Sequence, residues 1–237
     1  SNDGGLVFHL DAGPMEKVSV CSDRVWINRG KMFHHSLEVD SDGFFWAASQ
    51  IHPSKYHDLY GMYSDDSIVR LSPSGKVVFE KSVSEILEEN GFGALLFGMA
   101  GLVDPHLNDI QPALTTTKYW EKDDLLISIR NISTVLLYRP STQKIVWLKT
   151  GPWLNQHDAD FFGDSGITVF GNDVIRQGFV PYPYGNKVNN VYFVNLSSGV
   201  VSTPFADVMQ SADIRTPQQG LQEVLGKEDL HLFIEET

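Results

Sequence analysis

The segment TVLLYRPSTQKIVWL (residues 134–148) has the pattern of a β-hairpin, because two runs of aliphatic and aromatic residues flank a short polar turn. The same order occurs in SIVRLSPSGKVVFEK (residues 67–81) and in NVYFVNLSSGVVSTP (residues 190–204). Each turn contains serine together with proline or glycine, which are residue types that favour turns. A hairpin that recurs along the chain in this way is typical of a repeat architecture.

A second β-rich unit precedes each of these hairpins. The copies read HSLEVDSDGFFWAASQ (35–50), HLNDIQPAL with DLLISIRN (106–114 and 124–131) and HDADFFGDSGITVFGND (157–173), and a fourth, QGLQEVLGKEDLHLFIEET, covers 219–237. Two hairpins per repeat give four strands, which is the content of a propeller blade. We therefore expect an all-β fold, a β-propeller of four-stranded blades that forms a single domain over residues 1–237. The chain would cover about three to four blades of a six-bladed ring, with the C-terminal blades absent from this sequence.

Few residues depart from this β pattern. The segment VSEILEENGFGA (83–94) predicts a short helix that ends at Asn90 and Gly91. The stretch from Gln177 to Asn189 contains Pro181, Pro183 and Gly185, and it predicts a long irregular loop that could cover one face of the channel.

Composition limits the classes of function. The chain has 237 residues, 42% of them hydrophobic, and a formal net charge of −12. This charge favours solubility and argues against a broad nucleic-acid surface, which needs clustered cations. No apolar run is long enough for a membrane span. The single cysteine, Cys21, excludes a disulfide within the chain and is expected to be a small buried side chain.

Three histidines occupy the same place in successive repeats. His35, His106 and His157 each begin the first strand of a unit. Because the innermost strand of every blade lines the central channel, residues at this place converge on the axis although they are far apart in sequence. The repetition therefore predicts a cluster of three histidines. His52 and His57, in a polar loop, are expected at the surface.

Three more polar residues are candidates for the site. Arg130 ends an apolar strand, where an arginine is costly unless it meets an anion or forms a structural salt bridge with a carboxylate. Asn108 lies two residues after His106 and shares its face on a strand, so its amide could hold an oxyanion or orient that histidine. His34 adjoins His35 and should point the other way. It is kept as a substrate-binding candidate, and which of the two faces the channel is left open.

These motifs resemble those of the arylsulfotransferase (aryl-sulfate sulfotransferase, ASST) propellers. The resemblance rests on HLNDI (106–110), LISIRN (126–131) followed by Ser133, and WLNQHD (153–158), and it runs in the family's order from about Phe33 to the end. It implies transfer of a sulfuryl group from a phenolic sulfate to a phenol through a sulfated histidine, without a nucleotide donor. It also implies a periplasmic or extracellular, secreted location.

Carried over to this sequence, the resemblance implies particular roles. His157 would be the nucleophile, and Arg130 and Asn108 would hold sulfuryl oxygens. His106 and His35 would bind the sulfuryl group or exchange protons with the phenolic oxygen. No cofactor and no metal are implied, and the expected partners are a small aryl sulfate and a phenol. Three aromatic side chains could stack on an aryl ring, although core packing is the expected role: Trp153, Phe161 and Phe162.

Two other readings stay open at this point. Three histidines are common zinc ligands, so the cluster could serve a metal-dependent lyase or hydrolase, although Arg130 beside it would repel a cation. The propeller could also bind a ligand or a protein without catalysis. The sequence leaves the donor, the acceptor and the oligomeric state open.

Overall fold

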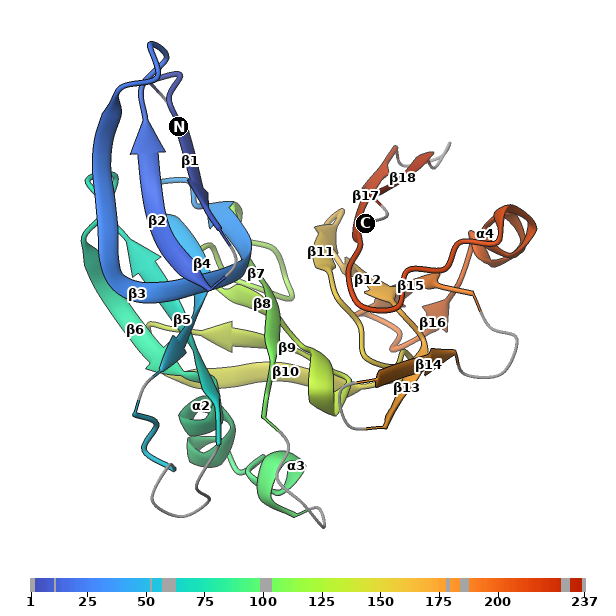
Figure 1. The fold of residues 1–237 in the computed structure, drawn as a ribbon. Helices are drawn as coiled ribbons and strands as arrows, with labels where there is room; N and C mark the ends of the chain where they lie inside the picture. The colour runs from blue at the N-terminus through green and yellow to red at the C-terminus, as the bar shows by residue number, and fades with distance from the viewer. Residues whose placement is uncertain are drawn as a thin grey trace.

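The computed structural model describes residues 3–10, 12–51, 53–56, 63–98, 104–177, 180–183, 188–226 and 231–235. Over these residues the chain forms antiparallel sheets that follow one another in chain order (Figure 1). This confirms the predicted all-β fold of four-stranded propeller blades.

The blades correspond to the repeats of the sequence. The first contains β3 (Arg24–Val39), β4 (Phe45–Ile51), β5 (Asp65–Leu71) and β6 (Val77–Ser82). The second contains β7 (Leu107–Pro112), β8 (Leu125–Ile129), β9 (Thr134–Arg139) and β10 (Lys144–Thr150). The third contains β11 (Ala159–Phe162), β12 (Gly166–Gly171), β15 (Asn190–Asn195) and β16 (Val201–Ser202). A further hairpin, β17 (Leu221–Leu225) with β18 (His231–Glu235), occupies the fourth repeat.

The first sheet is larger than a blade. The N-terminal strands β1 (Leu6–His9) and β2 (Gly13–Val18) extend it to six strands, because the long β3 pairs first with β2 and then with β4. The N-terminal part of β3 packs against the turn between β5 and β6, where the Trp26 indole N–H donates to the Pro73 carbonyl. Gly75 in this turn has a φ of 77°, and a Cβ there would lie 2.6 Å from the Trp26 ring, so both backbone and packing require glycine.

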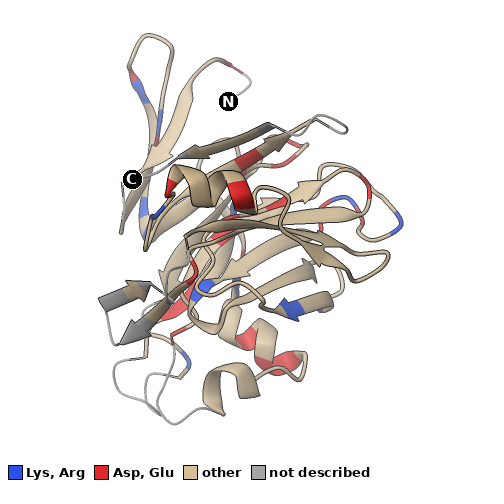
Figure 2. Ribbon diagram, turned by 90° about the vertical axis from the view of Figure 1, so that its right-hand side faces the viewer, with Lys and Arg blue, Asp and Glu red and all other residues tan. Residues whose placement is uncertain are grey.

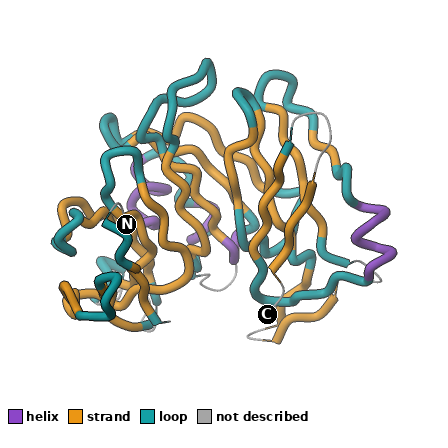
Figure 3. Tube along the Cα trace, turned by 90° about the horizontal axis from the view of Figure 1, so that it is seen from above, coloured by secondary structure: helices purple, strands orange, loops and turns teal. Residues whose placement is uncertain are grey.

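The helices are short. The predicted helix is present as α2 (Val83–Glu89), which is capped by the Ser82 side chain and ends at Asn90; α3 (Ala94–Phe97) follows it. A 3-10 turn, η1 (Arg130–Ile132), lies between β8 and β9, and α4 (Ala206–Ala212) lies at the periphery when the molecule is seen from above (Figure 3).

Two expectations from the sequence are wrong. The stretch from Gln177 to Asn189 is not entirely loop, because β13 (Val174–Gln177) and β14 (Val180–Pro183) form a hairpin. Cys21 is exposed rather than buried, since it lies in the turn between β2 and β3 that the Ser19 hydroxyl closes by accepting the backbone N–H of Cys21. His52 and His57 lie outside the described residues. Among the helices that are described, none is long and apolar enough to cross a membrane.

The core lies between the sheets rather than inside one. Along β8 the alternating side chains of Leu125, Ile127 and Ile129 face the first blade, where they pack with Trp46 and Ile68. The opposite face presents Leu126 to the third blade, where it packs with buried residues that include Trp153, Val169 and Tyr192. A strand buried on both faces gives a continuous apolar run instead of an alternating one, which explains the LLISI sequence.

The first two blades each contain a buried aspartate paired with an arginine. Asp40 accepts hydrogen bonds from Arg70, from the Trp46 indole and from the backbone N–H groups of Asp42 and Phe44. In the second blade Asp124 likewise accepts from the Arg139 guanidinium, through Nε and through NH2, both at 2.8 Å. Each pair ties the turn before one strand to the end of the next.

We predict that Asp40→Ala destabilises the protein strongly. The substitution removes the acceptor for a guanidinium and an indole N–H in a site where the Asp40 side chain is only 1% exposed. Breaking such a pair costs about 3 kcal/mol. Asp42→Ala in the same turn is the control, because Asp42 is half exposed and forms surface ion pairs of little worth. Urea denaturation measures both, and equal effects would contradict this account.

Candidate functional site

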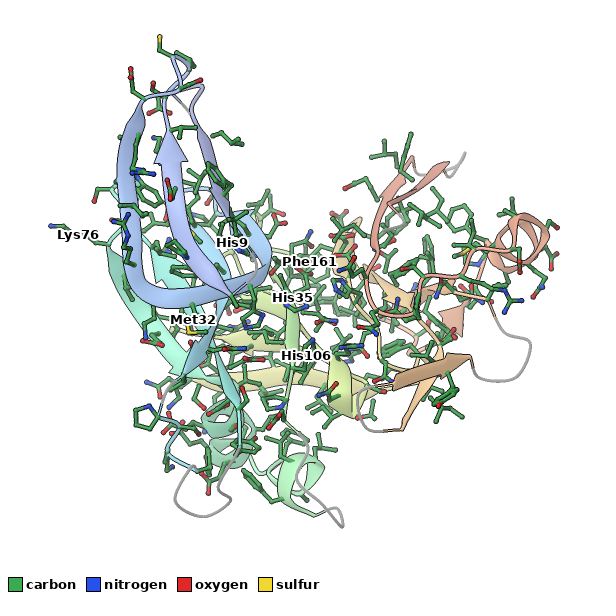
Figure 4. All side chains as sticks on the ribbon, viewed as in Figure 1. His9, Met32, His35, Lys76, His106 and Phe161 are labelled. Carbon is green, nitrogen blue, oxygen red and sulfur yellow. The ribbon has the colours of Figure 1, made fainter. Side chains whose placement is uncertain are left out.

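The three predicted histidines meet at the centre of the molecule. The ring centroids of His35 and His106 lie 5.0 Å apart, and those of His35 and His157 lie 5.4 Å apart. Figure 4 shows His35 and His106 close together where β3 passes β7, beside the sheet that begins with β11. The inner strands of three blades therefore bring the imidazoles together, as the repeat positions predict.

The backbone is distorted where it presents this cluster. His35 has a φ of 56° and His106 a φ of 54°, in the left-handed region that non-glycine residues seldom adopt. The pairing of β3 with β4 skips His35 and Ser36, and the pairing of β7 with β8 skips Asn108. Bulges of this kind turn side chains out of the regular alternation. Strained residues of this kind are characteristic of functional sites, where surrounding structure holds them in place.

A cavity of about 480 Å³ opens beside the histidines. Its lining comes from β1, β3, β7, the residues just before β11 and the start of β17, and therefore includes all four repeats. The lining residues are His9, His35, Ser36, Leu37, Glu38, Asn108, Asp109, His157, Asp158, Gln219, Gly220 and Leu221.

Arg130 is buried beside His106. Its backbone N–H donates to the His106 carbonyl at 2.9 Å, and its NH1 donates to the His106 Nε2 at 3.2 Å. The Nε and NH2 groups are buried without a hydrogen-bond partner among the described residues, and no carboxylate of those residues forms a salt bridge with the guanidinium. The sequence allows two partners for Arg130, an anion or a carboxylate in a structural salt bridge. The described residues do not form that salt bridge. A buried cation with free donors is the arrangement that receives an anion.

His157 is held as a neutral imidazole. Its side chain is buried, and neither ring nitrogen has a hydrogen-bond partner in the described part of the chain. Burial, and to a smaller degree the charge of the neighbouring His35, lowers the pKa of His157 to about 3. A neutral ring keeps a lone pair on one nitrogen, which is what a nucleophile requires.

Asn108 and Gln156 fix the position of this histidine. The Asn108 amide donates to the Gln156 carbonyl at 3.1 Å, while its Oδ1 is buried and meets no donor of a described residue. The Gln156 amide donates to the carbonyls of Ile129 and Thr134, which anchors the residue before His157 to the second blade. Asn108 thus lines the cavity and positions the segment that carries His157.

His34 does not line this cavity. It lies behind His35, with its Nδ1 at 2.7 Å from the Nδ1 of His35 and its Nε2 at 3.2 Å from a carboxylate oxygen of Asp66. The bulge at His35 interrupts the regular alternation of β3, and the two rings touch with their centroids 4.9 Å apart. His35 is the member of the pair that faces the cavity.

A group of buried carboxyls adjoins the histidines, and we did not predict it. Burial, followed by repulsion from Asp160, raises the pKa of Asp109 and of Asp158 well above the usual range. Burial, together with the charges of Glu223 and Glu38, raises the pKa of Asp160 to about 7. These groups hold protons that isolated carboxyls would release.

The sequence does carry a signal for this group. An acidic residue follows each cluster histidine by three positions, as Glu38, Asp109 and Asp160. In the fourth repeat, which begins at Gln219, Glu223 follows by four positions. The repeat that predicts a layer of histidines therefore also predicts a layer of carboxyls around the same axis.

The aromatic residues named as stacking candidates pack in the core. Trp153 is fully buried against Tyr192, and Phe161 packs at a tilt against Trp120 with ring centroids 4.7 Å apart. Phe162 contacts Phe193. Within the described part of the chain, no three His, Cys, Asp or Glu side chains are arranged to hold a metal ion.

We predict that the carboxyl layer makes the stability depend on pH. Because the folded state raises the pKa of Asp160 to about 7, the contribution of this carboxyl to stability is complete at low pH and is lost as the pH rises towards that value. Asp160→Asn imitates the protonated form, so the fall in Tm between pH 5 and pH 8 should shrink by roughly 7 °C, as a loss of about 2.5 kcal/mol over about two pH units would produce. Asp207→Asn on the exposed face of α4 is the control. An unchanged slope in Asp160→Asn would count against the assignment.

Solved structures show the same fold. The crystal structure of a protein of unknown function from Bacteroides caccae matches with a TM-score of 0.50 and 12% identity, over 84% of this chain and 55% of that chain. The WD40 repeats of RRP9 match with a TM-score of 0.50 and 11% identity, over 85% of this chain and 48% of that chain. WD40 repeats form β-propellers, so the likeness supports the fold alone. The chain spans about half the length of these structures.

The sequence comparison identifies a family. No curated protein sequence matches the chain. The family model described as Arylsulfotransferase (ASST) matches residues 12–237, which include the three histidines, Arg130 and Asn108. The chain therefore belongs to the arylsulfotransferase family.

Proposed function

We propose that the protein transfers a sulfuryl group from a phenolic sulfate ester to a phenol through a covalent sulfohistidine at His157. The observation that carries the proposal is the pair of buried, unpartnered groups at the cluster. Among the described residues, the ring nitrogens of His157 have no hydrogen-bond partner, and neither do the Nε and NH2 of Arg130. Leaving such groups unpaired is costly, so their presence indicates a ligand that pairs with both.

A sulfuryl group matches the free hydrogen-bond donors of Arg130 in charge and geometry. It carries negative charge on oxygens spread around a central atom, and its transfer depends on positioning and on electrostatic stabilisation, as for phosphoryl groups. The planar guanidinium of Arg130 offers two free donors in a fixed geometry, which suits two oxygens of one anion. The net charge of −12 makes this local cation more important (Figure 2), since the overall field repels an anionic substrate.

The reaction divides into two halves. In the first, a lone pair of His157 attacks the sulfur, the bond from sulfur to the phenolic oxygen breaks, and the phenol departs. In the second, the oxygen of an acceptor phenol attacks the same sulfur and the bond from nitrogen to sulfur breaks. His35 adjoins His157 and His106 adjoins His35, and between them the two residues supply proton exchange and anion binding. Such a sequence requires no nucleotide donor and gives ping-pong kinetics.

The location of the protein and its natural substrates stay predictions. The family resemblance favours the periplasm or the extracellular space. Binding without turnover is the competing function, and the experiments below separate the two.

We predict that His157→Ala abolishes turnover while the fold is kept. Loss of the nucleophile should lower kcat at least about 1000-fold. The wild-type protein, incubated with 4-nitrophenyl sulfate and digested, should yield a peptide that contains His157 and the added mass of one sulfuryl group. A wild-type protein that releases nitrophenol without modification of His157 would refute the covalent step. A protein that binds the ester and never releases nitrophenol would support the binding function instead.

We also predict that Arg130→Lys lowers kcat/KM by about 100-fold or more, because lysine keeps the charge but loses the fork of donors. Arg139→Lys is the matched control, since Arg139 lies at the end of β9 and pairs with Asp124, whereas Arg130 directly follows β8 and contacts His106. The control should lose stability and keep its turnover. Equal losses of turnover in both variants would show that the effect of Arg130 is structural.

A further inference from the structure

Two buried residues behind the cluster have no part in the transfer described so far. Asp66 on β5 and His34 on β3 have side chains that are 7% and 5% exposed. One Asp66 oxygen accepts from the Leu107 backbone N–H at 2.7 Å, and the other contacts the His34 Nε2 at 3.2 Å. The opposite nitrogen of His34 lies 2.7 Å from the Nδ1 of His35. A continuous chain of hydrogen bonds thus links a carboxylate to the cavity.

The chemistry of the donors fixes the direction of the protons along this chain. A carboxylate only accepts, so the Nε2 of His34 carries the hydrogen that faces Asp66. In neutral His34 the Nδ1 is then an acceptor, and the hydrogen between the two rings belongs to the Nδ1 of His35. Neutral His35 therefore keeps its lone pair on Nε2.

His106 has the opposite environment. Its Nε2 accepts from the guanidinium of Arg130 at 3.2 Å, and a guanidinium only donates. A proton added to this Nε2 would remove the acceptor of Arg130 and place two cations side by side. A proton added to His35 would instead be stabilised through His34 by the negative charge of Asp66. The two histidines occupy equivalent positions in their blades, yet only His35 is prepared to receive a proton.

The geometry points to a proton relay, Asp66–His34–His35, in which His35 is the general base for the acceptor phenol and Asp66 and His34 are its positioning residues. The inference rests on the proposed sulfuryl transfer, and it assigns to His106 the different task of holding Arg130. As the acceptor oxygen attacks sulfur, its proton passes to the Nε2 of His35 and the bonding pair of the breaking nitrogen–sulfur bond returns to His157. In the donor half, protonated His35 returns that proton to the departing phenoxide, so one cycle leaves the enzyme unchanged.

Other titratable groups also face His35. They lie on β1, on its own strand and on the inner strands of the other blades. Charged carboxylates among them act in the same sense as Asp66, and charged histidines act in the opposite sense. The groups are His34, His106 and His157 by ring contact, and His9, Glu38, Asp109 and Asp158 along the shared cavity. The pH dependence of the rate alone would therefore reflect all of these groups together. The test must instead separate the effect of Asp66 and His34 on His35 from the effects of the others.

Asp66→Asn reverses the relay without removing it. The buried Leu107 N–H needs an acceptor, so the oxygen of the introduced amide stays with it and the amide NH2 faces His34. His34 must then accept at Nε2 and donate from Nδ1, which moves the neutral hydrogen of His35 to Nε2. NMR of protein with 15N-labelled histidine reads this tautomer directly, without turnover. At a pH where His35 is neutral, we expect Nδ1–H on His35 in the wild type and Nε2–H in Asp66→Asn, and an unchanged tautomer overturns the relay.

The two half-reactions test the role of His35. In Asp66→Asn, sulfation of the enzyme by 4-nitrophenyl sulfate should stay within about threefold of the wild-type rate, because nitrophenolate leaves without a proton. Transfer onward to unsubstituted phenol should slow by about 100-fold or more, while transfer to a phenol that is already ionised should change little. His34→Gln should show the same pattern. Equal slowing of both halves, or of neither, overturns the assignment.

A matched control separates the relay from loss of structure. Asp65 adjoins Asp66 on the same strand and is buried, but among the described residues its carboxylate accepts only from Ser82 and Ser84. Asp65→Asn should therefore leave the ratio of the two half-reactions unchanged. A wild-type protein that never becomes sulfated would refute the proposed function, and the tautomer measurement would still decide the relay.

Discussion

The packing of each sheet against the next is the constraint on which the site depends. Apolar side chains project from both faces of the second blade. Ile127 packs in the core shared with the first blade, and Leu126 packs in the core shared with the third. Burial of this kind is the main favourable term in folding. Because it fixes the spacing of the sheets, it also fixes the spacing of their inner strands, and the histidines of three blades reach a common centre without any covalent link.

The same packing makes the centre costly to build. A guanidinium with two free donors and an imidazole with two free nitrogens are buried there among the described residues, beside carboxyls whose pKa is raised. Left-handed backbone at His35 and His106 adds strain. A hydrophobic core does not need these polar groups, and the protein would be more stable with apolar side chains in their place. The packed blades keep these buried polar groups and the strained backbone in place, as a rigid scaffold commonly does for a reactive site.

The sequence predicts most of the fold because its repeats are regular, and it predicts the histidine cluster because equivalent positions in blades converge. The N-terminal strands and the hairpin at β13 and β14 are not repeats, so no periodicity revealed them. Which of His34 and His35 faces the cavity stayed open, because strand alternation fails at a bulge, and a bulge depends on pairing between strands that a single sequence does not display. The carboxyl layer was overlooked although Glu38, Asp109 and Asp160 follow the histidines at a constant spacing.

The repeat also explains how identical residues acquire different chemistry. His35, His106 and His157 hold one position in three blades, but each meets a different neighbour: a carboxylate through His34, a guanidinium, and no hydrogen-bonding group among the described residues. A carboxylate favours the charged ring, a guanidinium disfavours it, and dry burial keeps the ring neutral. A base, an anchor for the anion-binding arginine and a nucleophile therefore arise from one residue type. These differences in chemistry come from residues behind the cluster, such as Asp66 and Arg130. At the axis of a propeller, residues from several blades can contact the same bound group.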